Sequence, residues 1–157
     1  MRAENVVIRT PFTTMRLAFE SDVLMSVDFL SQEKLSPPVS LVAKKVCQQV
    51  DAYCSKQLTN LKFDVELQAE GTPFQQSVWR ALQKIPAGQV LTYGQLAQQL
   101  KTSARAVGNA CRANPIPLLI PCHRVVSKSG MGGFSGSREG APVKIKAWLL
   151  EHEGVSI

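Results

Sequence analysis

The sequence lacks any apolar run long enough to cross a membrane. No stretch approaches the roughly 18 uninterrupted apolar residues that a membrane-spanning helix needs. The N-terminal segment MRAENVVIRT also lacks the apolar block of a signal peptide. We therefore expect a cytoplasmic protein, either free in the cytosol or associated with the nucleoid, and no membrane partner.

Cysteine and histidine are scarce. The four cysteines, Cys47, Cys54, Cys111 and Cys122, are too few and too scattered for a disulfide framework, so we expect free thiols. Cys47 and Cys54 lie seven residues apart on one face of an expected helix, where they either belong to an apolar core or bind zinc. A zinc ligand set is hard to assemble, because there is no CxxC pair and no histidine before His123. We expect no bound metal, and nothing in the chain resembles a cofactor site.

Acidic residues are rare in the second half of the chain. Residues 71–157 contain 10 basic and 3 acidic residues, a net charge of +7, whereas residues 1–70 contain 8 basic and 9 acidic residues, a net charge of −1. This asymmetry is typical of a lobe that binds a polyanion joined to a neutral lobe. Charge alone leaves open that the basic face is merely solvated.

The first 70 residues have the pattern of a small α+β lobe. Short apolar or alternating segments, Val6–Arg9, Met15–Phe19 and Val23–Phe29, are separated by turn signals and predict an antiparallel meander. Apolar residues at helical spacing from Leu41 to Cys54 follow a capping serine, Ser40, and Lys62–Leu67 alternates like a closing strand. This lobe carries no recognisable chemistry. The chain length allows either two lobes or one compact domain.

From Gly71 onward the pattern changes to short helices. One is expected to stop at Pro86-Ala87-Gly88, a second covers Tyr93–Leu100 after Thr92, and a third runs from about Ala104 to Ala113 after Ser103. The last two have the proportions of a helix-turn-helix. An amphipathic helix at about Pro142–Glu153 closes the chain. The expected class is therefore α+β, with a small N-terminal antiparallel sheet and helix (1–70) and a mostly helical C-terminal lobe (71–157).

The third of these helices combines arginines with small side chains. Arg105 and Arg112 are seven residues apart and so lie on one face. The small residues are Ala104, Ala106, Gly108, Ala110 and Ala113. They would let the backbone approach a partner closely, although a helix inside a core favours small residues as well.

The dipeptide Cys122-His123 interrupts an apolar segment. A cysteine becomes a strong nucleophile when a neighbouring base or positive charge favours its thiolate. On an extended segment, adjacent side chains point to opposite sides, so a direct contact between the two is not assured. The thiol proton would then reach His123 through a water molecule, or directly where a bent backbone brings the two side chains together. Taken alone, the dipeptide is better explained by an inert buried thiol, because buried cysteines are usually inert.

The segment IPCHRVV, residues 120–126, resembles the signature of the O6-alkylguanine-DNA alkyltransferases, also called methylated-DNA–protein-cysteine methyltransferases. Further segments match in the family's order and near its spacing, densely from Gly71 to Gly154 and only in general shape before that. They are Phe74-Gln75-Gln76 with Val78-Trp79, Pro86-Ala87-Gly88, Thr92-Tyr93-Gly94, Arg105-Ala106-Val107-Gly108, Asn114-Pro115-Ile116-Pro117, Gly133-Phe134-Ser135-Gly136, and Trp148-Leu149-Leu150 with Glu153. The resemblance implies a ribonuclease H-like first lobe and a second domain that binds DNA and holds the active site.

The resemblance also implies roles in catalysis. Cys122 would accept the alkyl group irreversibly, and His123 would pass its proton through a water toward Glu153. Asn114 would hold the active-site turn by hydrogen bonds. Tyr93 would donate a proton or hydrogen bond to the departing guanine. The alternatives are that Tyr93 is only a half-buried helix residue and that Glu153 is solvated at a frayed helix end.

The implied partner is double-stranded DNA containing O6-alkylguanine, bound by a monomer. A stacked guanine cannot reach a buried thiol, so the base must be turned out of the duplex. Arg105 would fill the space it leaves as the helix enters the minor groove, and Arg112 would contact phosphate. Ala104, Ala106, Gly108 and Gln75 complete the predicted DNA-binding set. Phe134, Ser135 and Gly136 would form a pocket wall, and Cys111 either lines that pocket or packs behind it.

Three readings of this site remain open. The first is a single-turnover alkyltransferase. The second is a thiol hydrolase with a Cys122–His123–Glu153 triad, which gives no reason for the helix-turn-helix or for Arg105. The third is a DNA-binding regulator, which leaves Cys122-His123 idle. The related alkyltransferase-like proteins lack the acceptor cysteine, whereas Cys122 is present here. The preferred alkyl size and any activity on O4-alkylthymine are not fixed by the sequence.

Overall fold

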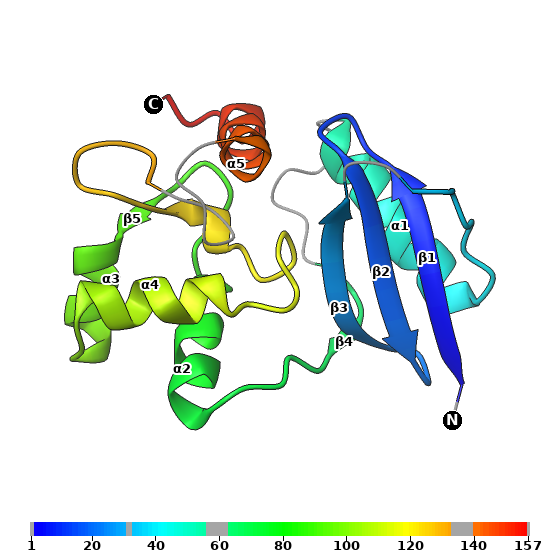
Figure 1. Cartoon of the computed structure of the whole chain (residues 1–157), viewed down its shortest axis with the longest axis horizontal. Coiled ribbons are helices and arrows are strands. Elements are labelled where there is room, and N and C mark those ends of the chain that lie inside the picture. Colours follow the sequence, from blue (N-terminus) through cyan, green and yellow to red (C-terminus); the bar gives the residue numbers. More distant parts are fainter. Residues whose placement is uncertain (1, 31–32, 56–62, 133–139, 157) are drawn as a thin grey trace. The chain divides into compact units, whose positions relative to one another are not determined.

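The computed structural model describes residues 2–30, 33–55, 63–132 and 140–156. The chain divides into two compact units, residues 1–69 and 70–157. The first contains a sheet and one helix, and the second contains mainly helices, which makes the fold α+β (Figure 1). Within the described segments, no helix is long and apolar enough to cross a membrane.

The sheet of the first unit begins as an antiparallel meander. Strands β1 (Ala3–Arg9), β2 (Thr14–Glu20) and β3 (Val23–Leu30) pair in sequence order. Two consecutive residues with positive φ, Ser21 and Asp22, form the tight turn between β2 and β3. Because side chains alternate across a sheet, one face collects the apolar residues Val6, Met15, Leu17, Leu24 and Val27, all at most 3% exposed.

The closing strand differs from the antiparallel sheet expected from sequence. Strand β4 covers only Glu66–Leu67 and pairs with β3 in parallel, so the sheet is mixed. Helix α1 (Leu41–Cys54) lies between β3 and β4 in the chain, and a strand, helix, strand connection returns the chain in its original direction. The expected strand Lys62–Leu67 was therefore too long, and residue 62 lies outside the described residues.

Helix α1 covers one face of the sheet (Figure 1). The hydroxyl of Ser40 caps it by accepting a hydrogen bond from the backbone N–H of Ala43, as expected. The buried face of the helix consists of Ala43, Val46, Cys47, Val50 and Tyr53. Cys47 is therefore part of the core, and the described residues contain no cluster of side chains that could hold a metal ion.

The second unit is a set of short helices with one small parallel strand pair. Its helices are α2 (Pro73–Leu82), α3 (Tyr93–Leu100), α4 (Ala104–Arg112) and α5 (Ala141–His152). Strands β5 (Leu91–Thr92) and β6 (Val125–Val126) pair directly before α3 and directly after the Cys122 segment. This pairing joins the start of α3 to the chain that carries Cys122.

Helices α3 and α4 form the expected helix-turn-helix. Thr92 and Gln95 build a capping box at the start of α3, and the hydroxyl of Ser103 caps α4. Lys101 ends α3 in a left-handed conformation with φ 56°, which turns the chain sharply into the next helix. Helix α2 ends at Leu82, earlier than expected, and Ile85 is buried in the turn that follows.

Candidate active site

A strained turn leads into Cys122. Leu118 has φ 75°, which is unusual for a residue with a side chain, and it is 3% exposed. The side chain of Asn114 holds this turn from both sides. Its Nδ2 donates to the carbonyl of Ile120 at 2.8 Å, and its Oδ1 accepts from the backbone N–H of Ile116 at 3.0 Å. These contacts are of the kind expected of Asn114.

Cys122 and His123 lie in a turn of 3-10 helix, Cys122–Arg124, and not in the extended segment expected from sequence. The bend has a local cause, because it follows Pro121 and is closed by a hydrogen bond from the N–H of Arg124 to the carbonyl of Pro121 at 3.0 Å. Both side chains are buried, with Cys122 at 7% and His123 at 0% exposure. The two side chains are therefore not directed to opposite faces as they would be on an extended strand.

His123 contacts Glu153. Its Nε2 lies 2.8 Å from Glu153 Oε2, and both side chains are completely buried. Glu153 is the C-cap of α5, so the helix end that sequence left open as frayed and solvated is in fact enclosed. Its carboxylate also accepts hydrogen bonds from Arg124, at 2.9 Å from Nε and at 3.0 Å from Nη2. These hydrogen bonds lower the pKa of Glu153 to about 2 although burial opposes this, so the carboxylate is ionised at neutral pH.

Burial dominates the protonation of the Cys122–His123 pair. It raises the pKa of the Cys122 thiol, and a hydrogen bond from the Asn114 side chain and the charge of Lys146 offset this only in part. Burial also lowers the pKa of His123, although Glu153 pulls in the other direction. The resting site therefore holds an uncharged thiol beside an uncharged imidazole. His123 Nδ1 is buried and accepts no hydrogen bond within the described part of the chain.

Lys146 was missed by the sequence reasoning. It is fully buried on α5, donates from Nζ to the carbonyl of Val125 at 2.7 Å, and lies 5.8 Å from the ring centroid of Tyr93. Burial lowers its pKa to about 8, so it is largely charged at pH 7 and favours a thiolate on Cys122. Its position could have been noticed, because Lys146 and Glu153 are seven residues apart on the face of α5 that buries Leu149.

The predicted residues Tyr93 and Cys111 belong to the same unit. Tyr93 is the first residue of α3 and is half-buried near Lys146. Cys111, near the end of α4, is also half-buried, and burial raises its pKa to about 12, with a further rise from Cys122 and an opposing effect of Lys146. Cys111, Cys122 and Lys146 therefore share one electrostatic environment.

The predicted DNA-binding residues of α4 lie largely at the surface. Ala104, Arg105 and Arg112 are exposed, whereas Ala106 and Gly108 are half-buried. Among the described residues, and apart from the backbone of α4 itself, no atom lies within 4 Å of the place where a side chain on Gly108 would begin. Gln75 is used differently, because its side-chain oxygen accepts from the N–H of Thr72 at 2.9 Å and closes the capping box of α2. The pocket residues Phe134, Ser135 and Gly136 lie outside the described residues.

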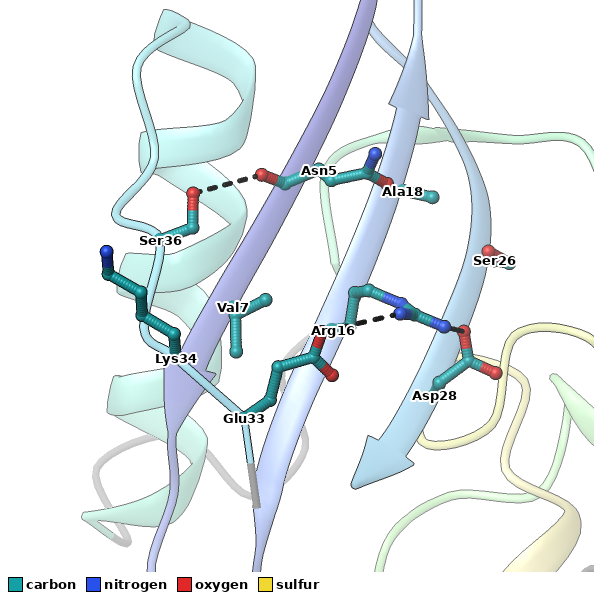
Figure 2. Close-up of a pocket in the computed structure, with 9 residues that line it drawn as sticks. All are labelled: Asn5, Val7, Arg16, Ala18, Ser26, Asp28, Glu33, Lys34 and Ser36. Carbon is teal, nitrogen blue, oxygen red and sulfur yellow. Dashed lines mark hydrogen bonds and ion pairs between the residues drawn. The ribbon is translucent and has the colours of Figure 1, made fainter. Parts of the chain in front are cut away.

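The first unit has a hollow on its surface. It lies over the sheet face opposite the apolar one, and Arg16 crosses it between the carboxylates of Asp28 and Glu33 (Figure 2). Its lining consists of Asn5, Val7, Arg16, Ala18, Ser26, Asp28, Glu33, Lys34 and Ser36. The described residues of this lining contain no cysteine and no histidine, whereas Cys122 and His123 lie together in the second unit.

The second unit thus combines a buried thiol, a histidine–carboxylate pair and a helix-turn-helix, which defines a thiol-based protein of the nucleic-acid-binding class. Residues 73–155 match the family model of the 6-O-methylguanine DNA methyltransferase DNA-binding domain. A methylated-DNA–protein-cysteine methyltransferase of Methanosarcina acetivorans is 36% identical over 157 residues, which covers 94% of this chain and 96% of that protein. The chain belongs to the O6-alkylguanine-DNA alkyltransferase, or methylated-DNA–protein-cysteine methyltransferase, family.

Three further matches agree. The enzyme of the same name from Salmonella typhimurium is 52% identical over 93 residues, covering 57% of this chain and 52% of that protein, so the match spans about half of the relative's length. The crystal structure of the Mycobacterium tuberculosis O6-methylguanine methyltransferase has a TM-score of 0.82 at 35% identity, covering 97% of this chain and 93% of the other. A complex of the M. tuberculosis protein with DNA has a TM-score of 0.78 at 37% identity, covering 94% and 90%.

Proposed function

We propose that this chain repairs DNA directly, by transferring the alkyl group of O6-alkylguanine in duplex DNA to Cys122. The observation that carries the proposal is the buried Glu153–His123 contact, 2.8 Å between Oε2 and Nε2, next to a buried thiol in the same turn. This arrangement supplies a base for a thiol that burial otherwise keeps protonated. Family membership supports the same reaction.

The transfer is one displacement at the alkyl carbon. The bond from Cys122 Sγ to carbon forms as the bond from carbon to O6 breaks, and the electron pair leaves on the guanine. The thiol proton passes through a water to His123 Nδ1, while Tyr93 donates a proton or hydrogen bond to the guanine. Asn114 holds the turn, and Lys146 stabilises the thiolate as it forms. The thioether product is a poor leaving group, so each molecule acts once.

The DNA-binding part of the proposal depends on α4. The helix exposes Arg105 in its first turn and Arg112 in its last, with small residues between them. We assign Arg105 to the space left by the extruded base and Arg112 to phosphate, with Ala104, Ala106 and Gly108 allowing close approach to the minor groove. A relative solved with DNA supports a DNA partner. The proposed activity also favours a cytoplasmic monomer that needs no cofactor.

The decisive experiment incubates the protein with duplex DNA that carries one O6-[³H]methylguanine. Label retained on the protein at Cys122, at no more than one methyl group per molecule, is the expected result. Label released to water identifies a hydrolase, and binding without transfer identifies a regulator. Removal of many methyl groups per protein molecule contradicts single turnover.

A further inference from the structure

Arg124 has no role in the reaction described so far, yet each of its three side-chain nitrogens donates a hydrogen bond at the site. Its Nε donates to Glu153 Oε1 at 2.9 Å and its Nη2 to Glu153 Oε2 at 3.0 Å. Its Nη1 donates to the carbonyl of Ile85 at 2.6 Å. The side chain is 13% exposed, and that of Glu153 is 0% exposed. A bidentate contact of this kind fixes both the position and the plane of the carboxylate.

The turn after α2 completes this support. Ile85 anchors the guanidinium, and three residues later Gly88 packs against the carbonyl of Glu153. A side chain on Gly88 would begin 3.2 Å from that oxygen, and the φ of 89° at this residue also favours glycine. Two contacts therefore meet at Glu153, where the turn at Gly88 packs against its backbone carbonyl and Arg124 binds its carboxylate. The carboxylate oxygen that receives Arg124 Nη2 is the same Oε2 that lies against His123.

The charges around His123 also indicate that Arg124 affects its protonation. The charged groups that act on His123 are Lys146 from α5, Glu153 from the C-cap of that helix, and Arg124 from its own turn. A lone buried carboxylate would favour an imidazolium partner. Arg124 already balances the charge of Glu153, and Lys146 adds a positive charge, so a second proton on His123 is opposed. With Nε2–H directed at Glu153, Nδ1 is left as the basic atom.

We propose that Arg124 is a positioning residue of the transfer reaction: it balances Glu153 so that His123 rests uncharged, with Nε2 donating to the carboxylate and Nδ1 free to take the thiol proton. For the identity of the reaction this inference rests on the proposed function. It concerns the base itself, however, and can be tested without DNA. Removing the charge of Arg124 should let Glu153 attract a proton onto His123.

The first test observes the tautomer directly. The chain has only two histidines, so ¹⁵N-labelled wild type and a His152→Asn variant are enough to assign the ring nitrogens of His123 by long-range ¹H–¹⁵N spectra. We expect a neutral ring with Nε2–H from pH 6 to 8 in the wild type. In Arg124→Gln we expect His123 to become protonated in the lower part of this range. An imidazolium or an Nδ1–H ring in the wild type at pH 7 overturns the proposal, even where the variant fails to fold.

The second test follows the rate at which Cys122 is alkylated by iodoacetamide, and the single-turnover rate on O6-methylguanine DNA, against pH. Arg124→Gln should move the acid limb of the rate profile upward by about two pH units, which is a roughly tenfold loss of rate near pH 6 that narrows toward pH 8. Arg124→Lys keeps the positive charge but loses the bidentate contact with Glu153. The rates of both reactions should therefore fall by about the same factor at every pH in this variant. Arg16→Gln, which removes an exposed arginine–carboxylate pair in the first unit, is the matched control.

These results separate the two proposals. A uniform loss in Arg124→Gln, or a profile like that of the wild type, overturns the role of Arg124. Absence of transfer from methylated DNA by the wild type overturns the proposed function, while the spectra and the iodoacetamide rates still decide the role of Arg124.

Discussion

The two units contain the same chemical pair in opposite surroundings. In the first unit Arg16 meets Asp28 at 3.2 Å with side chains that are 38% and 48% exposed. In the second unit Arg124 meets Glu153 at 2.9 Å with side chains that are 13% and 0% exposed. Water screens the first pair and leaves it little effect on its neighbours. The second pair is shielded, so it determines the charge of the groups around it.

The two units also differ in which side chains they bury. The first unit buries almost only apolar side chains and leaves its charges on the open sheet face (Figure 2). The second unit buries Cys122, His123, Lys146 and Glu153 together. Ionisable groups cost free energy to bury unless they are paired, so a cluster of them indicates a function that requires it.

The largest effect should come from replacing Cys122 by Ser. A hydroxyl is much harder to deprotonate than a thiol and is a weaker nucleophile toward saturated carbon, so methyl transfer should fall below detection. Binding to the same DNA should persist, with an affinity that decreases as salt rises, because phosphate contacts release counterions. Gel-shift titrations at several salt concentrations, beside the transfer assay, test both parts. Residual transfer would place the acceptor elsewhere.

The second prediction concerns Glu153→Gln. The imidazole loses the carboxylate that orients it, and single-turnover transfer should slow by about 100-fold. The folded pKa of Glu153, about 2, lies below the ordinary value of 4.5, so its stabilising effect is complete above about pH 4.5 and is lost as pH falls toward 2.

Urea unfolding measures this dependence. The wild type should exceed Glu153→Gln by on the order of 3 kcal/mol at pH 7, and the difference should shrink at pH 3.5. A gap that does not change with pH contradicts the ionised carboxylate, and equal transfer rates remove Glu153 from the mechanism.

Arg105→Ala should have a smaller and more selective effect. Extruding a base from a duplex costs a few kcal/mol, whereas free O6-benzylguanine has no stack to leave. Repair of duplex DNA should therefore fall by about tenfold while reaction with the free base stays nearly unchanged. Parallel rate measurements on the two substrates decide this, with Lys101→Ala as a control for basic charge near the turn. Equal losses on both substrates would assign Arg105 to the fold or the pocket.

The smallest effect should come from Arg16→Gln. Its ion pairs are exposed, so the free energy of unfolding should change by less than about 1 kcal/mol, and the pH profile of transfer should not move. Chemical denaturation and the transfer assay together test this. A loss of several kcal/mol, or a shifted profile, would remove the contrast between the two arginines.

Local signals predicted much of the fold. The capping residues Ser40, Thr92 and Ser103 marked three helix starts correctly, because a cap depends on neighbours within one turn. The parallel direction of β4 was not predicted, because it depends on how a distant segment returns to the sheet. The bend at Cys122 has a local cause in Pro121, but the apolar sequence around it was taken as extended. The family's motifs pointed to Glu153, and helical spacing could have placed Lys146 on the same helix face, but the contacts of Arg124 and Lys146 needed the structure. Their partners Glu153 and Val125 lie 29 and 21 residues away, where periodicity gives no information.

The capping of the second unit has a consequence for the order of folding. Thr72 with Gln75 and Thr92 with Gln95 give two helices closed caps made entirely from adjacent residues. Such helices form on the microsecond scale, whereas contacts across about 30 residues must first close a loop. We therefore expect α2 and α3 to form before Arg124 and His123 reach Glu153. During synthesis and refolding, His123 gains the carboxylate that orients it only when the last helix docks, so an incompletely folded chain lacks the complete base for Cys122.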